Sequence, residues 1–78
     1  MRNALPELRA ERGWSQGALG ERVGVSRQAI NAIERGKHDP SILLAFKLAR
    51  AFRLPVEAVF DPELPEPERL EPEPSEAD

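Results

Sequence analysis

Apolar residues in the middle of the chain recur three or four positions apart. Leu19 is followed by Val23, and Ile30 is followed by Ile33. Residues at this spacing lie on the same face of an α-helix, so each pair marks a side that turns toward a core. The spacing therefore predicts two short amphipathic helices in close succession.

Residues that commonly start and end helices stand at the borders of these two segments. Ser15 and Ser26 each precede an apolar pair, and serine is a preferred N-cap residue. Gly24 stands where the first helix must end, because glycine readily adopts the left-handed conformation found there. The borders predict helices over about residues 16–23 and 27–35, joined by a tight turn.

The same kind of pattern predicts three further helices. One covers about residues 4–12, with Asn3 as its N-cap. Another covers about residues 42–52, and a last short one covers about residues 56–60. The expected fold class is therefore all-α, a compact bundle of five short helices.

The helix over residues 42–52 carries more apolar residues than a core-facing stripe needs. At 100° per residue, one arc holds Ile42, Leu44, Ala45, Leu48, Ala49, Ala51 and Phe52. Leu43 and Phe46 fall on the other side, among basic residues. Together with exposed parts of the last helix near Val56 to Phe60, they form the surface expected for self-association. Val56, Val59 and Phe60 are also expected to close the core.

The composition changes at residue 62. Residues 62–78 are rich in proline and glutamate, and Leu64 and Leu70 are their only large apolar residues. So little apolar surface does not offset the entropy lost on ordering. We therefore predict a domain over residues 1–61 followed by a disordered acidic tail.

Charge is divided between these two parts. Through Phe60 the chain has ten basic and six acidic residues, a net charge of +4. From Asp61 onward, eight acidic residues and one basic residue give −7. The overall charge of −3 hides a basic body, which is typical of a nucleic acid-binding domain with a separate appendage.

Several function classes find no support in the sequence. The chain has 78 residues and no cysteine, so we expect one small domain with no disulfide and no thiolate metal site. It has no apolar run long enough to span a membrane and no signal-peptide pattern, so the expected location is cytoplasmic. No pattern suggests an enzyme, a cofactor, a metal or a small-molecule ligand.

A longer motif runs through both central helices. Residues 15–36 read S-Q-x-x-L-x-x-x-x-G-V-S-R-Q-x-I-x-x-I-E-x-G, preceded by L-R-A-E-R-G and followed by H-D-P-S and L-A-F-K-L-A-R-A-F. This pattern resembles the Xre/Cro type of helix-turn-helix found in phage repressors and small bacterial regulators. The resemblance covers roughly residues 3–60 and implies a lambda repressor-like DNA-binding domain. In such a domain the second helix of the motif lies in the major groove.

The resemblance assigns roles to particular positions. The position of Gln16 contacts backbone phosphate, and those of Arg27, Gln28, Asn31 and Ala32 face base edges or nearby backbone. Basic side chains at the end of the second helix are expected to meet phosphates. The DNA-binding residues are thus predicted to be Gln16, Ser26, Arg27, Gln28, Asn31, Ala32, Arg35 and Lys37. The resemblance also implies a partly buried structural ion pair between Arg9 and Glu34.

The sequence thus indicates a transcriptional regulator that binds a double-stranded DNA operator. We expect a repressor that acts as a homodimer on a palindromic site. The alternative is a protein-interaction module, such as an antitoxin, whose main partner is another protein.

Overall fold

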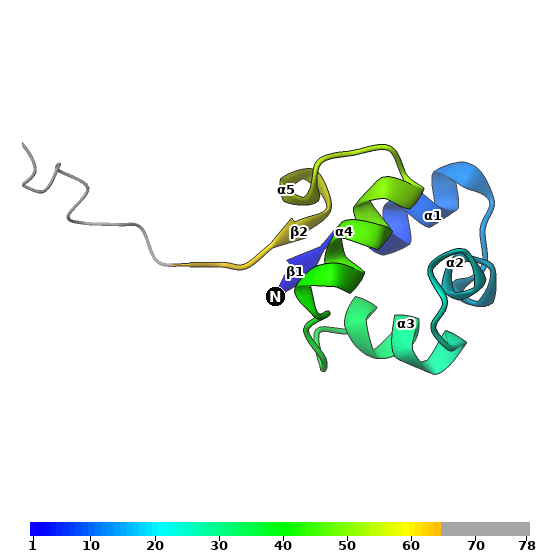
Figure 1. Ribbon diagram of the computed structural model, residues 1–78, viewed down its shortest axis with the longest axis horizontal. Helices are drawn as coiled ribbons and strands as arrows, with labels where there is room; N and C mark the ends of the chain where they lie inside the picture. The colour runs from blue at the N-terminus through cyan, green and yellow to red at the C-terminus, as the bar shows by residue number, and fades with distance from the viewer. Residues whose placement is uncertain (65–78) are drawn as a thin grey trace, which may run out of the picture.

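The computed structural model describes residues 1–64. Five helices and two very short strands make up this part of the chain: β1 (Arg2–Asn3), α1 (Leu5–Arg12), α2 (Gln16–Val23), α3 (Arg27–Glu34), α4 (Ile42–Ala51), α5 (Val56–Val59) and β2 (Phe60–Asp61). In Figure 1, α4 lies in the middle of the body, α2 lies at the right end, α3 lies below, and α5 with the strands lies at the left. The predicted helical bundle is confirmed, whereas the predicted disorder of the tail falls mostly on residues 65–78, outside the described residues.

The helix borders follow the predicted signals closely. The hydroxyl oxygens of Ser15, Ser26 and Ser41 each accept a hydrogen bond from the backbone N–H three residues later. Gly24 ends α2 with a φ of 80°, in the left-handed region. Capping of both α2 and α3 by serine fixes the two helices of the motif at their N-terminal ends.

The ends of the domain form a strand pair that the sequence pattern did not predict. β1 and β2 are antiparallel, with Arg2 opposite Asp61 and Asn3 opposite Phe60. The predicted last helix was therefore one residue too long, because Phe60 belongs to β2. Strands of two residues are too short to show the alternating pattern by which a strand is predicted.

Asn3 lies in β1 and is not the N-cap of the first helix, so that prediction was wrong. Its Oδ1 accepts a hydrogen bond from Leu5 N at 3.1 Å, while Ala4 occupies the N-cap position. Its Nδ2 donates to the carbonyl oxygen of Ile33 at 3.0 Å. The start of the chain is therefore tied to the C-terminal end of α3.

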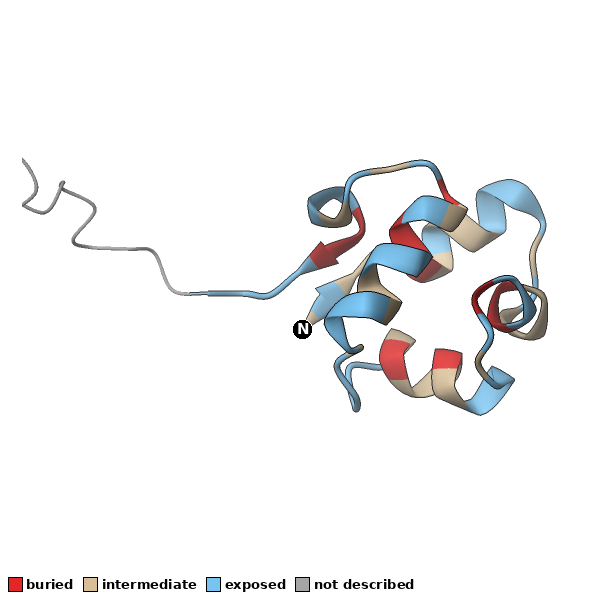
Figure 2. Ribbon diagram, in the orientation of Figure 1, coloured by how far each residue is buried: buried red, intermediate tan, exposed pale blue. Residues whose placement is uncertain are grey.

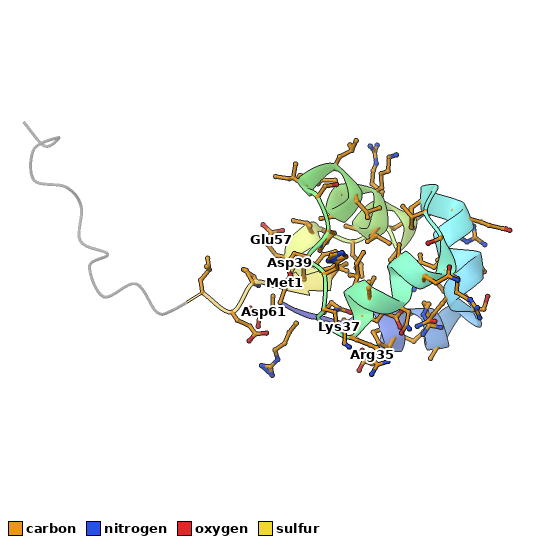
Figure 3. All side chains as sticks on the ribbon, turned by 90° about the horizontal axis from the view of Figure 1, so that it is seen from below. Met1, Arg35, Lys37, Asp39, Glu57 and Asp61 are labelled. Atoms are coloured by element: carbon orange, nitrogen blue, oxygen red, sulfur yellow. The ribbon has the colours of Figure 1, made fainter. Side chains whose placement is uncertain are left out.

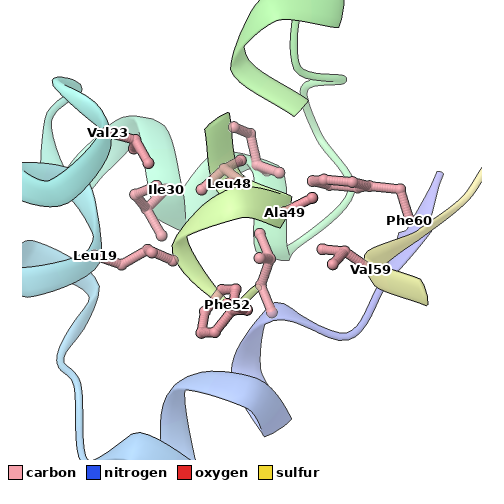
Figure 4. Close-up of a cluster of buried hydrophobic side chains, with 10 residues drawn as sticks. Leu19, Val23, Ile30, Leu48, Ala49, Phe52, Val59 and Phe60 are labelled. Atoms are coloured by element: carbon pink, nitrogen blue, oxygen red, sulfur yellow. The ribbon is translucent and has the colours of Figure 1, made fainter. Parts of the chain in front are cut away.

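The core is one cluster of buried side chains to which every helix contributes. It contains Leu5, Leu19, Val23, Ile30, Ile33, Leu48, Ala49, Phe52, Val59 and Phe60. Figure 2 shows the buried residues on the inward sides of the helices, and Figure 4 shows the cluster around α4. The apolar pairs of α2 and α3 thus face the core, as their spacing predicts.

Ile42 departs from its predicted place in the core arc of α4. Its exposed fraction is 76%. A helical wheel gives the direction of a side chain but not whether another element extends far enough to cover it, and Ile42 is the first residue of α4. Leu43 and Phe46 are exposed, as the wheel predicts.

Candidate nucleic acid interface

The backbone of the turn between α2 and α3 packs closely against Gly20 of α2. A Cβ atom added at Gly20 would lie 2.5 Å from the carbonyl oxygen of Val25 and 3.3 Å from that of Ser26. The backbone N–H of Val25 donates back to the Gly20 carbonyl at 2.9 Å. This close packing sets the position from which α3 starts.

The outer face of α3 holds the predicted base-reading residues. Ile30 and Ile33 turn this helix toward the core, so the opposite face is left for solvent. Arg27 and Gln28 are exposed in the first turn, and Asn31 and Ala32 are half-buried one turn later. Within residues 1–64, the side chains of Arg27, Gln28 and Asn31 make no hydrogen bond or ion pair with the protein. Their polar atoms are therefore available to a ligand.

Glu34 joins three elements at the back of the motif. Its Oε2 lies 2.6 Å from Arg9 Nε, and its Oε1 lies 3.0 Å from Arg9 Nη2. The Gln16 Nε2 atom donates to the same Oε1 at 2.9 Å, and Arg9 Nη1 donates to the Trp14 carbonyl at 3.0 Å. Hydrogen bonding to Glu34 raises the pKa of the Arg9 guanidinium above its ordinary value. The bidentate pair therefore ties α1, the start of α2 and the end of α3 together.

The amide of Gln16 is consequently not free in the structure. One N–H of its Nε2 donates to Glu34, while the second N–H and the carbonyl oxygen have no partner within residues 1–64. A phosphate contact from Gln16 is compatible with this arrangement, since it needs only that second N–H.

Basic residues follow the end of α3. Gly36, with a φ of 75°, turns the chain, and the backbone N–H groups of Lys37 and His38 donate to the Ala32 carbonyl. Arg35, Lys37 and His38 are all exposed. Figure 3 shows Arg35 and Lys37 on the side of the molecule that also carries Met1 and Asp39. Arg35 and Lys37 form a positively charged surface at the end of α3, which we call the basic edge.

Trp14 is engaged inside the protein. The centroid of its ring lies 5.2 Å from the centroid of the Phe52 ring. The guanidinium of Arg22, on α2, lies 3.9 Å from the centroid of the Trp14 ring. Arg12 stacks on Phe52 at 5.0 Å and donates to the Phe52 carbonyl. Trp14 is thus packed in the protein rather than placed for stacking on a base, as its position before the α2 cap suggests.

The predicted self-association residues fall into different classes of exposure. Leu43 is 63% exposed and Phe46 is 51% exposed, whereas Val56 is half-buried and Phe60 is 7% exposed. Phe60 is buried, as expected of a residue that closes the core, so the accessible part of the last segment lies at Val56. Phe46, Val56 and Phe60 nevertheless line one apolar hollow of about 400 Å³ between α4 and α5.

Among residues 1–64, no three His, Cys, Asp or Glu side chains are grouped as a metal site would require. None of the described helices is long and apolar enough to cross a membrane.

Sequence reasoning missed two contacts that support the site. Neither the Asn3–Ile33 hydrogen bond nor the Gln16–Glu34 hydrogen bond has a local sequence signal, because the partners are 30 and 18 residues apart. A polar residue at the end of a predicted helix has several possible partners, and the pattern does not choose among them.

Comparison with known proteins agrees with this geometry. The chain matches the helix-turn-helix family over residues 7–59. It is 53% identical over 60 residues to the HTH-type transcriptional regulator YgzD of Bacillus subtilis, covering 77% of this chain and 91% of that one. It is 48% identical over 60 residues to the regulator MJ0272 of Methanocaldococcus jannaschii, with the same coverage of 77% and 91%.

A solved structure shows the same fold. The restriction-modification controller protein C.AhdI from Aeromonas hydrophila superposes with a TM-score of 0.66 at 34% identity, over 72% of this chain and 81% of that one. The match to the motif, the related regulators and the shared fold lead to one assignment. The chain belongs to the helix-turn-helix family of DNA-binding transcriptional regulators, of the Xre/Cro type.

Proposed function

We propose that this chain is a sequence-specific repressor that binds a palindromic operator as a homodimer. The observation that carries the proposal is the exposed first turn of α3. There Arg27 and Gln28 follow the capping residue Ser26 and have no partner within residues 1–64. The N-terminal residues of such a helix enter the major groove first.

Base reading is assigned to the outer face of α3. The Arg27 guanidinium has the donor fork that bonds guanine O6 and N7, and the Gln28 amide matches adenine N6 and N7. Asn31 and Ala32 lie one turn further along the helix, where Ala32 permits close approach to the bases. The operator is therefore read over a few base pairs by each copy of α3.

Phosphate contacts hold this helix in register. Gln16 lies at the start of α2 and the basic edge follows the end of α3, so the two groups flank the recognition helix. Contacts on both sides of the groove fix the orientation of the protein but do not distinguish sequences.

The dimer is assigned to the apolar surface on α4 and α5. Leu43 and Phe46 are exposed, and Phe46 borders the hollow lined by Val56 and Phe60. A second copy packed there by two-fold symmetry buries the same patch on both chains. Two recognition helices about 34 Å apart then read two half-sites one DNA turn apart. Occupation of a promoter by this dimer blocks transcription.

Selection of bound fragments from a pool of random duplexes tests the proposal. We expect an inverted repeat whose half-site centres are separated by about 10 base pairs. The double variant Arg27→Ala, Gln28→Ala should lose the enriched sequence, whereas Glu7→Ala, on the exposed side of α1, should retain it. Enrichment of a single half-site would contradict the dimer, and no enrichment would contradict sequence-specific binding.

The alternative of a protein-interaction module uses the same apolar hollow for a different partner. It predicts that the purified chain stays monomeric at micromolar concentration and enriches no inverted repeat. A measured dimer that selects a palindrome decides for the repressor.

A further inference from the structure

The acidic C-terminal segment leaves the body next to the loop that follows α3. The α-amino nitrogen of Met1 lies 3.8 Å from Asp39 Oδ1 and 4.0 Å from Glu63 Oε2. Asp39 stands two residues after Lys37, in the loop between α3 and α4. Met1 therefore links Glu63, just before the acidic segment, to the loop that contains Lys37.

Positive and negative residues lie near each other where the acidic segment begins. Figure 3 shows Asp61 and Met1 on the same side of the molecule as Lys37 and Arg35. Within residues 1–64, neither Arg35 nor Lys37 forms an ion pair. Among the described residues, the charge of the basic edge is thus not neutralised, and an acidic segment begins nearby.

The segment has the charge and the length to reach the basic edge. After Glu63 it contains six acidic residues and one basic residue. The 15 residues from Leu64 to Asp78 span at most roughly 50 Å at 3.3–3.6 Å per residue, whereas an eight-residue helix such as α3 is about 12 Å long. A segment tethered this close to its target has an effective concentration on the order of millimolar.

We propose that residues 64–78 compete with DNA phosphates for the basic edge of the same molecule. This inference rests on the proposed function, because it concerns the phosphate contacts of that site. Carboxylates occupy the positions of phosphate oxygens on Arg35 and Lys37, and DNA must displace them to bind. The competition lowers the affinity for every DNA sequence by the same factor. Random DNA, which binds weakly, is then released first, whereas the operator stays bound through its base contacts.

Two sets of charge-neutralising substitutions in the full chain test the proposal. The segment variant replaces three tail glutamates by glutamine: Glu68, Glu71 and Glu73. The matched control replaces three exposed glutamates of α1 and α2 by glutamine: Glu7, Glu11 and Glu21. Both variants change the net charge by the same amount, so a long-range effect of net charge acts on both alike.

The probe is a mixed-sequence duplex of about 20 base pairs, which binds through phosphates alone. We expect the segment variant to bind at least about fivefold more tightly than wild type at about 50 mM salt, and the control less than about twofold. The gain should vanish at about 300 mM salt, where the screening length falls to a few ångströms. Equal affinities of the two variants would overturn the proposal.

Amide NMR signals of the DNA-free protein give a second readout. We expect the signals of residues 35–38 to differ between wild type and segment variant at low salt and to coincide at high salt. Differences confined to the basic groove between α2 and α4, at Arg22, Lys47 and Arg50, would place the segment elsewhere and overturn the proposal. If no variant binds duplex DNA, the proposed function fails, and the signals of residues 35–38 still show whether the segment docks there.

Discussion

Replacing Gly20 by alanine should destabilise the domain, although alanine is the better helix former. The added Cβ would lie 2.5 Å from the Val25 carbonyl oxygen, which is a backbone atom and has no rotamer to change. The turn is also held in place by the hydrogen bond from Val25 N to the Gly20 carbonyl. Overpacking of this kind costs up to about 3 kcal/mol, while helix propensity returns about 1 kcal/mol. We therefore expect a net loss of about 2 kcal/mol in the free energy of unfolding.

Gly17 provides the matched control for this substitution in the same helix. A Cβ there would meet only the Ser15 hydroxyl oxygen, at 3.9 Å. Gly17→Ala should therefore raise the free energy of unfolding by up to about 1 kcal/mol, from propensity alone. The same chemical change in one helix thus has opposite expected signs at two positions three residues apart.

Thermal unfolding followed by circular dichroism measures both effects. In a domain of this size, 1 kcal/mol shifts Tm by about 4–8 °C, so Gly20→Ala should lower Tm by about 8–16 °C. Gly17→Ala should raise Tm by a few degrees at most. If Gly20→Ala melts at or above the wild-type temperature, the turn is not as tightly packed as the Gly20 geometry requires, and the reasoning is refuted.

Four further predictions concern binding, assembly and stability. Arg27→Ala should cost about 1–3 kcal/mol on the selected operator and little on random DNA, whereas Lys37→Ala should weaken both alike and reduce the salt dependence; equal losses for Arg27→Ala would assign it to phosphate. Phe46→Glu should remain folded, because the side chain is 51% exposed, and should sediment as a monomer; a variant that still sediments as a dimer would remove Phe46 from the interface. Arg53 has a φ of 59°, so Arg53→Gly should raise stability by about 1 kcal/mol in urea unfolding, and Arg53→Ala, which keeps the strain, should not. Truncation after Asp61 should change Tm by less than about 2 °C, because the lost Glu63 pair is exposed; a larger loss would show that the tail belongs to the folded domain.

The sequence predicts this fold well because the helices carry strong local signals. Serine caps at Ser15, Ser26 and Ser41 and a glycine at Gly24 mark the helix ends, and each signal depends on neighbouring residues alone. The core of α2 and α3 follows from spacing for the same reason.

What the pattern does not predict is set by contacts between distant residues. The exposure of Ile42 depends on how far other elements extend, and the place of Phe60 in a strand depends on pairing with the first residues of the chain. At the candidate interface, the exposed face of α3 follows from periodicity, but the capture of Gln16 by Glu34 does not. A family resemblance supplies roles for such positions without supplying their side-chain partners.

The pairing of β1 with β2 has a consequence for the order of folding. The helices of the motif are neighbours in sequence and need only short loops to meet, whereas Asn3 and Phe60 must close a loop that spans nearly the whole domain. The strand pair is therefore expected to form late, after the helical contacts. Because Asn3 also holds the Ile33 carbonyl at the end of α3, the recognition helix is locked at that end only when the last residues of the domain have been made. A nascent chain that stops before Phe60 therefore has its helix-turn-helix but lacks the strand pair that holds Asn3 in place.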